Sequence, residues 1–485
     1  GGGLRDASCD RLLRGDQFNA ASVGGREPKF ACIPHADERP SRAGPRRLQL
    51  QKSLAHPTSR YSAAMNATTP RPDGLAWAQR LVRFNTVSHA SNLPLIECIA
   101  DHLRTLGVPL RLTWDEERRK ANLFATLGAG KPGGLVLSGH TDTVPVDGQD
   151  WSSEPFKATH RDGRIHGRGT ADMKGFIAIA LAWAPRFLAA QERLPVHLSL
   201  TYDEETTFLG VNGLVADLAE RGIRPAGCII GEPTDMQAIV AHKGKRDLCC
   251  RVRGREAHSA LTPQGVNAIE FAARLIAYIR GVADRLARDE PRDDRFAVPH
   301  STLQTGLIKG GIATNVVPRD CEFHFEMRNL PSMSHDTMEG EIVGYAEREL
   351  VPQMRRVAAD AGIAFERGLD LPAFGIARDA ELVRWAQQVA RTTHLGTGAV
   401  SFATEASVFM KAGIPTVVLG PGSIEQAHKP DEYISYAQVA ACEAFFAQMI
   451  EQPLPGAKCC ATPHLGRPSS ARRARTTVPT RARCS

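Results

Sequence analysis

Acidic residues and histidines gather in five short segments of this 485-residue chain. The segments are 138–145 (SGHTDTVP), 167–175 (GRGTADMKG), 203–205 (DEE), 231–234 (GEPT) and 426–432 (QAHKPDE). Histidine nitrogens and carboxylate oxygens are the usual zinc ligands of catalytic sites. Two histidines with several carboxylates would form the ligand set of a two-metal hydrolytic site, where bound ions activate water.

Each segment alone also has an ordinary structural explanation. His140 and Asp142 could form a surface pair in a turn, Asp172 could cap a helix, and residues 203–205 could lie in a solvated turn. However, residues two apart on an extended chain project to one side, which suits an imidazole held by a carboxylate. Three adjacent buried acids repel one another unless a cation is present. The combination therefore favours a metal site.

The elements around these segments predict an α/β domain. Short apolar strands are expected at 134–138, 196–202, 227–231 and 416–419, and helices at 75–84, 95–106, 175–191, 379–391 and 435–450. Strands that alternate with helices indicate βαβ units and a mostly parallel sheet. In open α/β sheets, ligands bind outside the carboxyl ends of the strands. Several of the acidic segments follow predicted strands, so we expect them to meet at this edge.

A second style of structure interrupts this pattern. Strands are expected at 247–253, 302–309, 321–328 and 363–367, with long helices at 267–286 and 337–360. This β-α-β-β-α-β order predicts a small α+β domain with an antiparallel sheet. The sequence therefore predicts a catalytic domain over 65–244 and 371–453, with an inserted domain over 245–370.

The charge distribution sets the two ends of the chain apart. The net charge is +7, but residues 1–64 hold 11 basic and 6 acidic residues, and residues 454–485 hold 7 basic residues and no acid. The remaining body has a net charge of −5. We expect 1–64 to be a disordered or artefactual extension and 454–485 a disordered basic tail. An acidic body without a nucleic-acid-reading motif argues against a nucleic-acid-binding protein, although the basic tail could contact nucleic acid.

Apolar runs and cysteines bear on where the protein works. The longest apolar run, 175–185, is about half of the ~20 residues that a membrane span requires. Six of the 11 cysteines lie in the body, and none of these forms a C-x-x-C pair. Buried free thiols in apolar strands indicate a reducing compartment. We therefore expect a cytoplasmic protein with no membrane partner.

The ordered motifs HTDTVP, GRGTADMKG, DEE, GEPT and AHKPDEY closely resemble those of the M20 family of zinc aminoacylases and peptidases. The resemblance covers about residues 70–450. It implies a zinc-exopeptidase-like catalytic domain with a mixed, mostly parallel sheet, interrupted by a ferredoxin-like lid and dimerisation domain. It also implies a homodimer and two divalent metal ions, with zinc expected and cobalt or manganese as alternatives.

The resemblance assigns the metal ligands residue by residue. His140 and Glu232 would hold one ion, Glu205 and His428 would hold the other, and Asp172 would bridge them. The peptide bond after Asp172 is typically cis in this family.

Three further residues would take part in the chemistry. Asp142 would orient His140, and Glu204 would be the general base that takes a proton from water and passes it to the leaving amine. His258, in the segment GREAHSA, would stabilise the developing oxyanion, commonly across the dimer. Its alternative is a histidine in an ordinary loop.

Substrate contacts are expected from three places. Asn315 lies in a turn (GGIATNVVP) that resembles the substrate-contacting turn of the family. Arg328 could clamp a substrate carboxylate, or it could be an exposed strand arginine. Glu405 could pair with a distal ammonium group, or it could cap the helix that starts there.

Within the family, the segments FATEA and GPGSIEQAH resemble those of acetylornithine deacetylases. The reaction expected from this resemblance is hydrolysis of N2-acetyl-L-ornithine to acetate and L-ornithine, a step of arginine biosynthesis. The alternatives are a succinyl-diaminopimelate desuccinylase, a general N-acyl-amino-acid amidohydrolase or a carboxypeptidase.

Overall fold

The computed structural model describes residues 73–128, 133–390, 398–452 and 454. The predicted extension 1–64 and nearly all of the basic tail 454–485 lie outside these residues. Among the helices that are described, none combines the length and the hydropathy that a membrane span requires.

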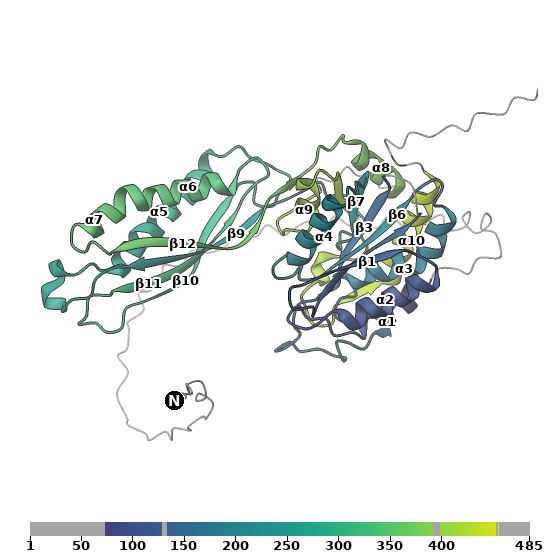
Figure 1. Ribbon diagram of the computed structural model, residues 1–485, viewed down its shortest axis with the longest axis horizontal. Coiled ribbons are helices and arrows are strands. Elements are labelled where there is room, and N and C mark those ends of the chain that lie inside the picture. Colours follow the sequence, from purple (N-terminus) through teal and green to yellow (C-terminus); the bar gives the residue numbers. More distant parts are fainter. Residues whose placement is uncertain (1–72, 129–132, 391–397, 453, 455–485) are drawn as a thin grey trace, which may run out of the picture. The chain divides into compact units, whose positions relative to one another are not determined.

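A six-stranded sheet forms the centre of the α/β fold, in the order β1-β2-β6-β3-β7-β15 (Figure 1). Its strands are β1 (Leu110–Trp114), β2 (Ala121–Leu127), β3 (Leu135–His140), β6 (Val196–Thr201), β7 (Gly227–Ile230) and β15 (Thr416–Val418). β3 runs parallel to both β6 and β7, and β15 runs parallel to β7. β1 and β2 are antiparallel to each other, and β2 is antiparallel to β6. The predicted α/β class with a mixed, mostly parallel sheet is therefore confirmed.

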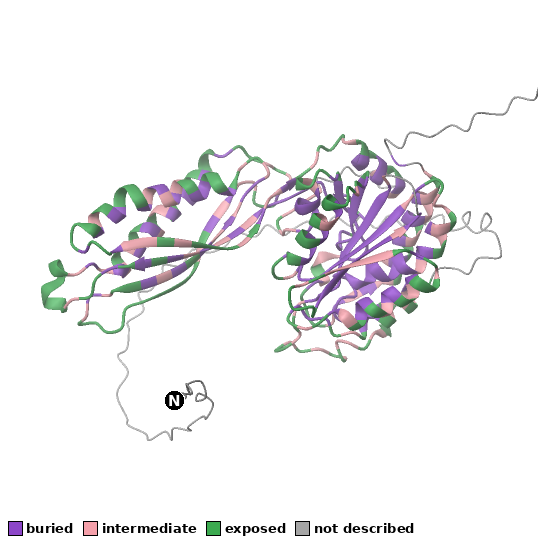
Figure 2. Ribbon diagram, viewed as in Figure 1, coloured by how far each residue is buried: buried purple, intermediate pink, exposed green. Residues whose placement is uncertain are grey.

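Helices cover both faces of this sheet, because its central strands alternate apolar residues toward each side. One hydrophobic cluster joins the sheet to α1 (Gly74–Val82), α2 (Leu93–Thr105), α3 (Lys174–Ala189), α8 (Glu381–Ala390) and α10 (Tyr436–Glu451). A second cluster joins the opposite face to α4 (Leu209–Glu220) and α9 (Ala406–Lys411). Figure 2 shows the resulting burial of the central strands.

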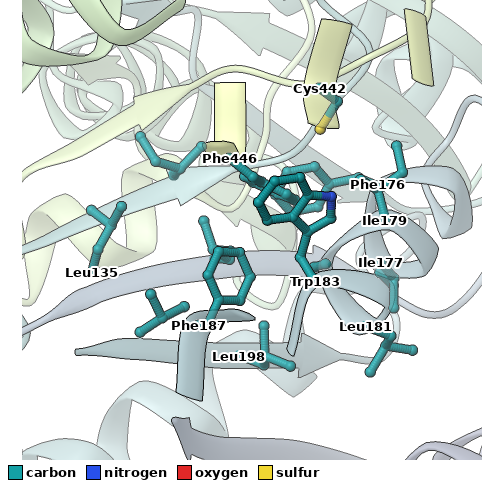
Figure 3. Close-up of a cluster of buried hydrophobic side chains, with 14 of the residues drawn as sticks. Leu135, Phe176, Ile177, Ile179, Leu181, Trp183, Phe187, Leu198, Cys442 and Phe446 are labelled. Carbon is teal, nitrogen blue, oxygen red and sulfur yellow. The ribbon is translucent and has the colours of Figure 1, made fainter. Parts of the chain in front are cut away.

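Helix α3 packs between the sheet and α10 (Figure 3). Phe176 and Phe187 each form a T-shaped pair with Phe446 at centroid distances of 5.8 and 5.3 Å. Aromatic pairs of this kind contribute ~0.5–1.5 kcal/mol beyond their buried area. The start of α3, which follows directly on the segment that holds Asp172, is thus fixed by the core.

A four-stranded antiparallel sheet forms the second part of the fold, in the order β10-β11-β9-β12. Its elements follow one another as β9 (Lys245–Arg253), α5 (Ala268–Asp289), β10 (Thr302–Gly310), β11 (Asp320–Arg328), α6 (His335–Tyr345), η2 (Ala346–Leu350), α7 (Val351–Arg355) and β12 (Gly362–Leu371). The helices pack on one face of the sheet around a hydrophobic core of their own.

The long helix predicted over 337–360 is confirmed in part: helical residues run without a break from His335 to Arg355, but they do not form one regular α-helix. The structure instead has α6, the π-helical turn η2 and the short helix α7, which ends at Arg355. Pro352 has no backbone N–H to donate to the carbonyl four residues earlier, so a regular α-helix cannot continue across it. A π-helical turn is a common local adjustment to such an interruption.

Small sheets and short helical turns complete the structure. They are the sheets β13-β8-β14 (Phe374–Gly375, Ala241–His242, Ala399–Val400) and β16-β5-β4 (Tyr433–Ser435, Arg164–His166, Thr159–Arg161), with the 3-10 turns η1 (Ser259–Gln264) and η3 (Ile424–Gln426). The pairing of Tyr433 with His166 matters most for the site. It holds the segment 426–432 beside the segment 167–172, although the two are far apart in the sequence.

Candidate metal centre

The carboxyl ends of three neighbouring strands supply three of the predicted site residues. His140 is the last residue of β3, Glu204 comes three residues after β6, and Glu232 comes two residues after β7. Because β3 lies between β6 and β7, these side chains meet at one edge of the sheet. Asp172 lies two residues before α3, and His428 lies between η3 and β16.

Asp172 lies between the two histidines. Its Oδ1 is 3.0 Å from Nε2 of His140, and its Oδ2 is 3.3 Å from Nε2 of His428. The two oxygens of one carboxylate therefore face two different imidazoles. This is the arrangement that a bridging ligand requires. The Asp172–Met173 peptide bond is cis, as the family resemblance implies.

The remaining acids lie around the two histidines. Glu232 Oε1 lies 3.8 Å from Nε2 of His140, and these two residues and Glu204 offer ligand atoms that lie within 4.8 Å of one another. Glu205 Oε2 lies 3.1 Å from Nε2 of His428. His140 and Glu232 therefore lie on one side of Asp172 and His428 lies on the other. Glu205 contacts His428 but is also close to His140, because the ligand atoms of His140, Asp172 and Glu205 lie within 4.8 Å of one another.

Asp142 holds His140, but mainly through its backbone. Nδ1 of His140 lies 3.0 Å from the Asp142 carbonyl oxygen and 3.6 Å from its Oδ1. A carbonyl only accepts, so Nδ1 carries the proton and Nε2 is left to face the acids. The Asp142 carboxylate instead accepts hydrogen bonds from the backbone N–H groups of Glu204 (3.1 Å) and Glu205 (3.2 Å). Asp142 therefore positions both neighbouring acids as well as the histidine.

The acids of this cluster are paired with histidines. Among the described residues, no lysine or arginine forms an ion pair with Asp142, Asp172, Glu204, Glu205 or Glu232. Burial raises the pKa of Glu232 well above its usual range, and repulsion by Asp172 adds to the shift. Burial also raises the pKa of Glu204. Hydrogen bonds to Asp172 and Glu205 raise the pKa of His428 to about 10.

The donor chemistry of the cluster fits divalent cations. Buried charges in proteins are either paired or coordinated to metal ions. Here His140, Asp142, Asp172, Glu204 and Glu232 are all buried, and their carboxylates outnumber the histidines. A set that mixes imidazole with carboxylate suits zinc and other transition metals better than the all-oxygen ions magnesium and calcium.

Comparison with a protein-family model decides the family. Residues 136–452 match the model of peptidase family M20/M25/M40, and this range includes every ligand candidate above. The chain belongs to peptidase family M20/M25/M40. The family resemblance expected from the motifs is confirmed.

Individual M20 relatives agree in sequence and in fold. The chain is 37% identical to the acetylornithine deacetylase of Proteus mirabilis over 364 residues, which cover 74% of this chain and 90% of the relative. A tripeptidase structure from Staphylococcus aureus has a TM-score of 0.61 at 19% identity and covers 79% of this chain and 99% of its own. A dinuclear metal-binding M20 peptidase from Bacillus subtilis has a TM-score of 0.51 at 15% identity and covers 77% and 98%. The last two comparisons concern the fold alone.

Two further predicted residues lie side by side in the second part of the M20 fold. His258 is exposed, and its Nδ1 accepts a hydrogen bond from Ala260 N, 3.1 Å away. The next residue, Ser259, donates its backbone N–H to the carbonyl oxygen of Asn315 at 3.1 Å. Asn315 is also exposed. Both side chains are therefore accessible on neighbouring segments.

Arg328 at the end of β11 is half-buried and already has a partner. Its Nε lies 2.8 Å from Oε1 of Glu326 and its Nη2 lies 3.3 Å from Oε2 of the same residue. A substrate carboxylate would have to compete with Glu326 for this guanidinium.

Glu405 lies inside the fold. It is 1% exposed, and its carboxylate accepts hydrogen bonds from the hydroxyls of Thr201 (2.5 Å) and Ser138 (3.2 Å). Burial raises its pKa to about 7. This position does not support the predicted contact with a substrate ammonium group. The alternative prediction, that Glu405 caps α9, is confirmed for its position only: Glu405 is the N-cap residue of α9, but its side chain forms no capping hydrogen bond.

Sequence reasoning missed several residues that hold the ligands. Lys120 Nζ lies 2.5 Å from Oδ1 of Asp203, the residue before Glu204, and Ser88 donates its hydroxyl to Asp142 at 2.7 Å. Neither residue lies near a motif, so the sequence offered no signal. Glu432 and Arg168 lie within the quoted motifs but received no role.

Proposed function

We propose that this chain hydrolyses the amide bond of N2-acetyl-L-ornithine to acetate and L-ornithine, with two divalent metal ions, preferably zinc. The observation that carries a two-ion hydrolase is the shared Asp172, whose two oxygens face His140 and His428. The substrate is supported by relatives named acetylornithine deacetylase that are 35–37% identical and matched over 90–91% of their length.

His140, Glu232 and Asp172 would hold one ion, and His428, Glu205 and Asp172 would hold the other. When bound, such ions polarise a carbonyl oxygen and lower the pKa of water toward neutrality. The tautomer of His140 supports its role as a ligand. Its Nδ1 donates to the Asp142 carbonyl, so Nε2 remains free to coordinate an ion.

Glu204 is proposed as the general base. It would take a proton from the attacking water and pass it to the leaving nitrogen, so that the amide C–N bond breaks to give a carboxylate and an amine. Its raised pKa, caused by burial and by neighbouring carboxylates, suits a group that both accepts and releases a proton near neutral pH. The backbone hydrogen bond from Glu204 N to Asp142 limits where its carboxylate can point.

His258, Asn315 and Arg328 are proposed to act on the substrate from the inserted domain. His258 would donate to the developing oxyanion, and a single such donor is typically worth ~3–4 kcal/mol of transition-state stabilisation. Asn315 and Arg328 would contact the amino-acid part. The proposed homodimer would form through this domain.

The proposed setting is the cytoplasm, within arginine biosynthesis. Free cysteines are typical of reducing compartments. All six cysteines among the described residues are free, which supports this setting.

The test is a substrate profile of the purified full chain reconstituted with Zn²⁺ or Co²⁺. Initial rates would be measured for N2-acetyl-L-ornithine, N-succinyl-diaminopimelate and a set of other N-acetyl amino acids, with Glu204→Gln as the inactive control. We expect kcat/KM to be highest for N2-acetyl-L-ornithine. Faster turnover of N-succinyl-diaminopimelate would assign the chain to the alternative activity in the same family.

A further inference from the structure

Glu432 is a buried carboxylate that the proposed mechanism does not use. Its side chain is 0% exposed, and its two oxygens accept four hydrogen bonds. Oε1 accepts from the backbone N–H groups of Ala171 (2.8 Å) and Asp172 (3.1 Å). Oε2 accepts from Gly169 N (3.0 Å) and from Nη1 of Arg168 (2.8 Å). Glu432 therefore binds the backbone at the shared ligand Asp172 and at the residues just before it.

Glu432 also belongs to the segment that carries His428. Three residues separate the two, and β16 begins directly after Glu432. The His428 side chain is 54% exposed, so burial in the core cannot hold it in place. The hydrogen bonds of Glu432 are thus a direct attachment of the His428 segment to the Asp172 segment.

Arg168 and Gln149 extend this attachment. The Arg168 side chain is 1% exposed, and it stacks on Trp151 at 5.0 Å from the ring centroid. Its Nη2 donates to Oε1 of Gln149 at 2.6 Å, while Nε2 of Gln149 donates to the carbonyl oxygen of His428 at 2.9 Å. Three separate segments therefore meet around Arg168, and two of them carry metal-ligand candidates.

We propose that Glu432, with Arg168 and Gln149, is a positioning residue that holds His428 at the distance from Asp172 needed to bind the second metal ion. This inference rests on the proposed two-ion function. It predicts a selective effect: weakening the attachment should release the ion held by Glu205 and His428. The ion held by His140 and Glu232 should be affected less, because His140 and Glu232 are carried by the ends of core strands.

Glu432→Gln is the main variant. It keeps the size of the side chain and one oxygen, but it turns an NH₂ group toward N–H donors. The metal-free full chain would be titrated with Zn²⁺ in competition with a chromophoric chelator, and unfolding midpoints would be recorded without metal. Substitutions of outer residues that orient ligands typically weaken metal affinity about 10- to 100-fold. We expect a loss of this size for the second ion and a clearly smaller loss for the first, so that Glu432→Gln resembles His428→Ala.

Two further variants keep the test decisive. Glu425→Gln is the matched control, because Glu425 lies in the same part of the chain with its side chain 78% exposed, and it should bind both ions as the unmodified chain does. Gln149→Ala removes a partly exposed side chain and its contact with the His428 carbonyl. It should weaken the second ion several-fold without changing the metal-free unfolding midpoint, and it decides the question if Glu432→Gln does not fold.

The proposal is overturned if folded Glu432→Gln binds both ions like the unmodified chain. It is also overturned if both ions weaken equally, since that result indicates a general loss of structure. If the unmodified chain itself binds fewer than two ions, the proposed function fails first.

Discussion

Two clusters of charged residues in this protein differ in how their negative charge is balanced. In the inserted sheet, Arg246 of β9 has a side chain that is only 6% exposed and pairs with Asp336 (2.7 Å), Glu339 (2.6 Å) and Asp370 (2.6 Å). Although burial alone would raise the pKa of Asp370, hydrogen bonds from His335 and Arg246 hold it well below its usual range. This cluster contains its own cation.

Three acids of the candidate metal centre show the opposite shift. In Asp142 and Asp172, by contrast, the effect of burial is outweighed by hydrogen bonds from histidine, which lower the pKa. Burial and mutual repulsion raise the pKa of Glu204, Glu205 and Glu232, and among the residues described none of them pairs with lysine or arginine. In the Arg246 cluster, an arginine of the chain neutralises the acids. In the candidate metal centre, bound metal ions could neutralise them. Strongly perturbed carboxylates of this kind concentrate at functional sites.

The largest effect should come from Glu204→Gln. Removing the general base should lower kcat about 10²- to 10⁴-fold, while the ions and the fold remain. Steady-state kinetics together with metal analysis would check this result. Full retention of activity would remove the general-base assignment, and loss of both ions would instead make Glu204 a ligand.

Metal removal should have the second-largest effect. It should destabilise the candidate metal centre but leave the Arg246 cluster unchanged. At a free ion concentration 100 times Kd, each ion that binds only the folded chain stabilises it by about 2.7 kcal/mol. Thermal unfolding of the full chain with Zn²⁺ and with a chelator would measure this difference. An unfolding midpoint that does not respond to Zn²⁺ would contradict the contrast between the clusters.

Arg246→Met should lower stability without changing metal content. Removal of one partner from a buried ion pair costs ~3–5 kcal/mol. The Asp336 and Asp370 side chains are 73% and 40% exposed, so we expect about 2 kcal/mol here. Urea unfolding would measure the loss. Arg251→Met is the matched control on the same strand, because the Arg251 side chain is 56% exposed and its loss should cost much less than the loss of Arg246.

The smallest effect concerns pH. The folded pKa of Asp370 is lowered, so its stabilising contribution is present above the unfolded pKa of about 4 and is lost as the pH falls through the folded value. Asp370→Asn should therefore cost about 1 kcal/mol at pH 7, and the difference from the unmodified chain should shrink below pH 4. A difference that stays constant between pH 7 and pH 3 would show that the charge of Asp370 contributes nothing.

The sequence predicted the elements that have a clear period and the ligands that lie in motifs. Helix α3 and strand β3 were expected close to their observed bounds, because a continuous apolar run marks each of them. The acids after β6 and β7 were expected at one sheet edge, because they directly follow apolar runs that mark neighbouring parallel strands. The sequence could not show that Asp142 binds the backbone of Glu204 and Glu205, since that contact depends on three-dimensional proximity.

The sequence patterns did not predict which charged side chains are buried. Glu405 follows a loop and precedes a helix, so a solvent-facing or capping role was reasonable. The structure instead buries it against the hydroxyls of Ser138 and Thr201. Glu432 and Arg168 are likewise charged residues of the kind that is almost never fully buried unless paired. Only the fold shows that each has the other as its partner.

The most direct test of the account is the number of divalent ions that the metal-free full chain binds. Titration with Zn²⁺, followed by calorimetry and by metal analysis after gel filtration, should give two ions per chain. Glu205→Ala and Glu232→Ala should each lower the occupancy, because each removes a ligand from one side of Asp172. A chain that binds no ion, or that binds equally well after both substitutions, would contradict the assignment of this cluster as a two-metal centre.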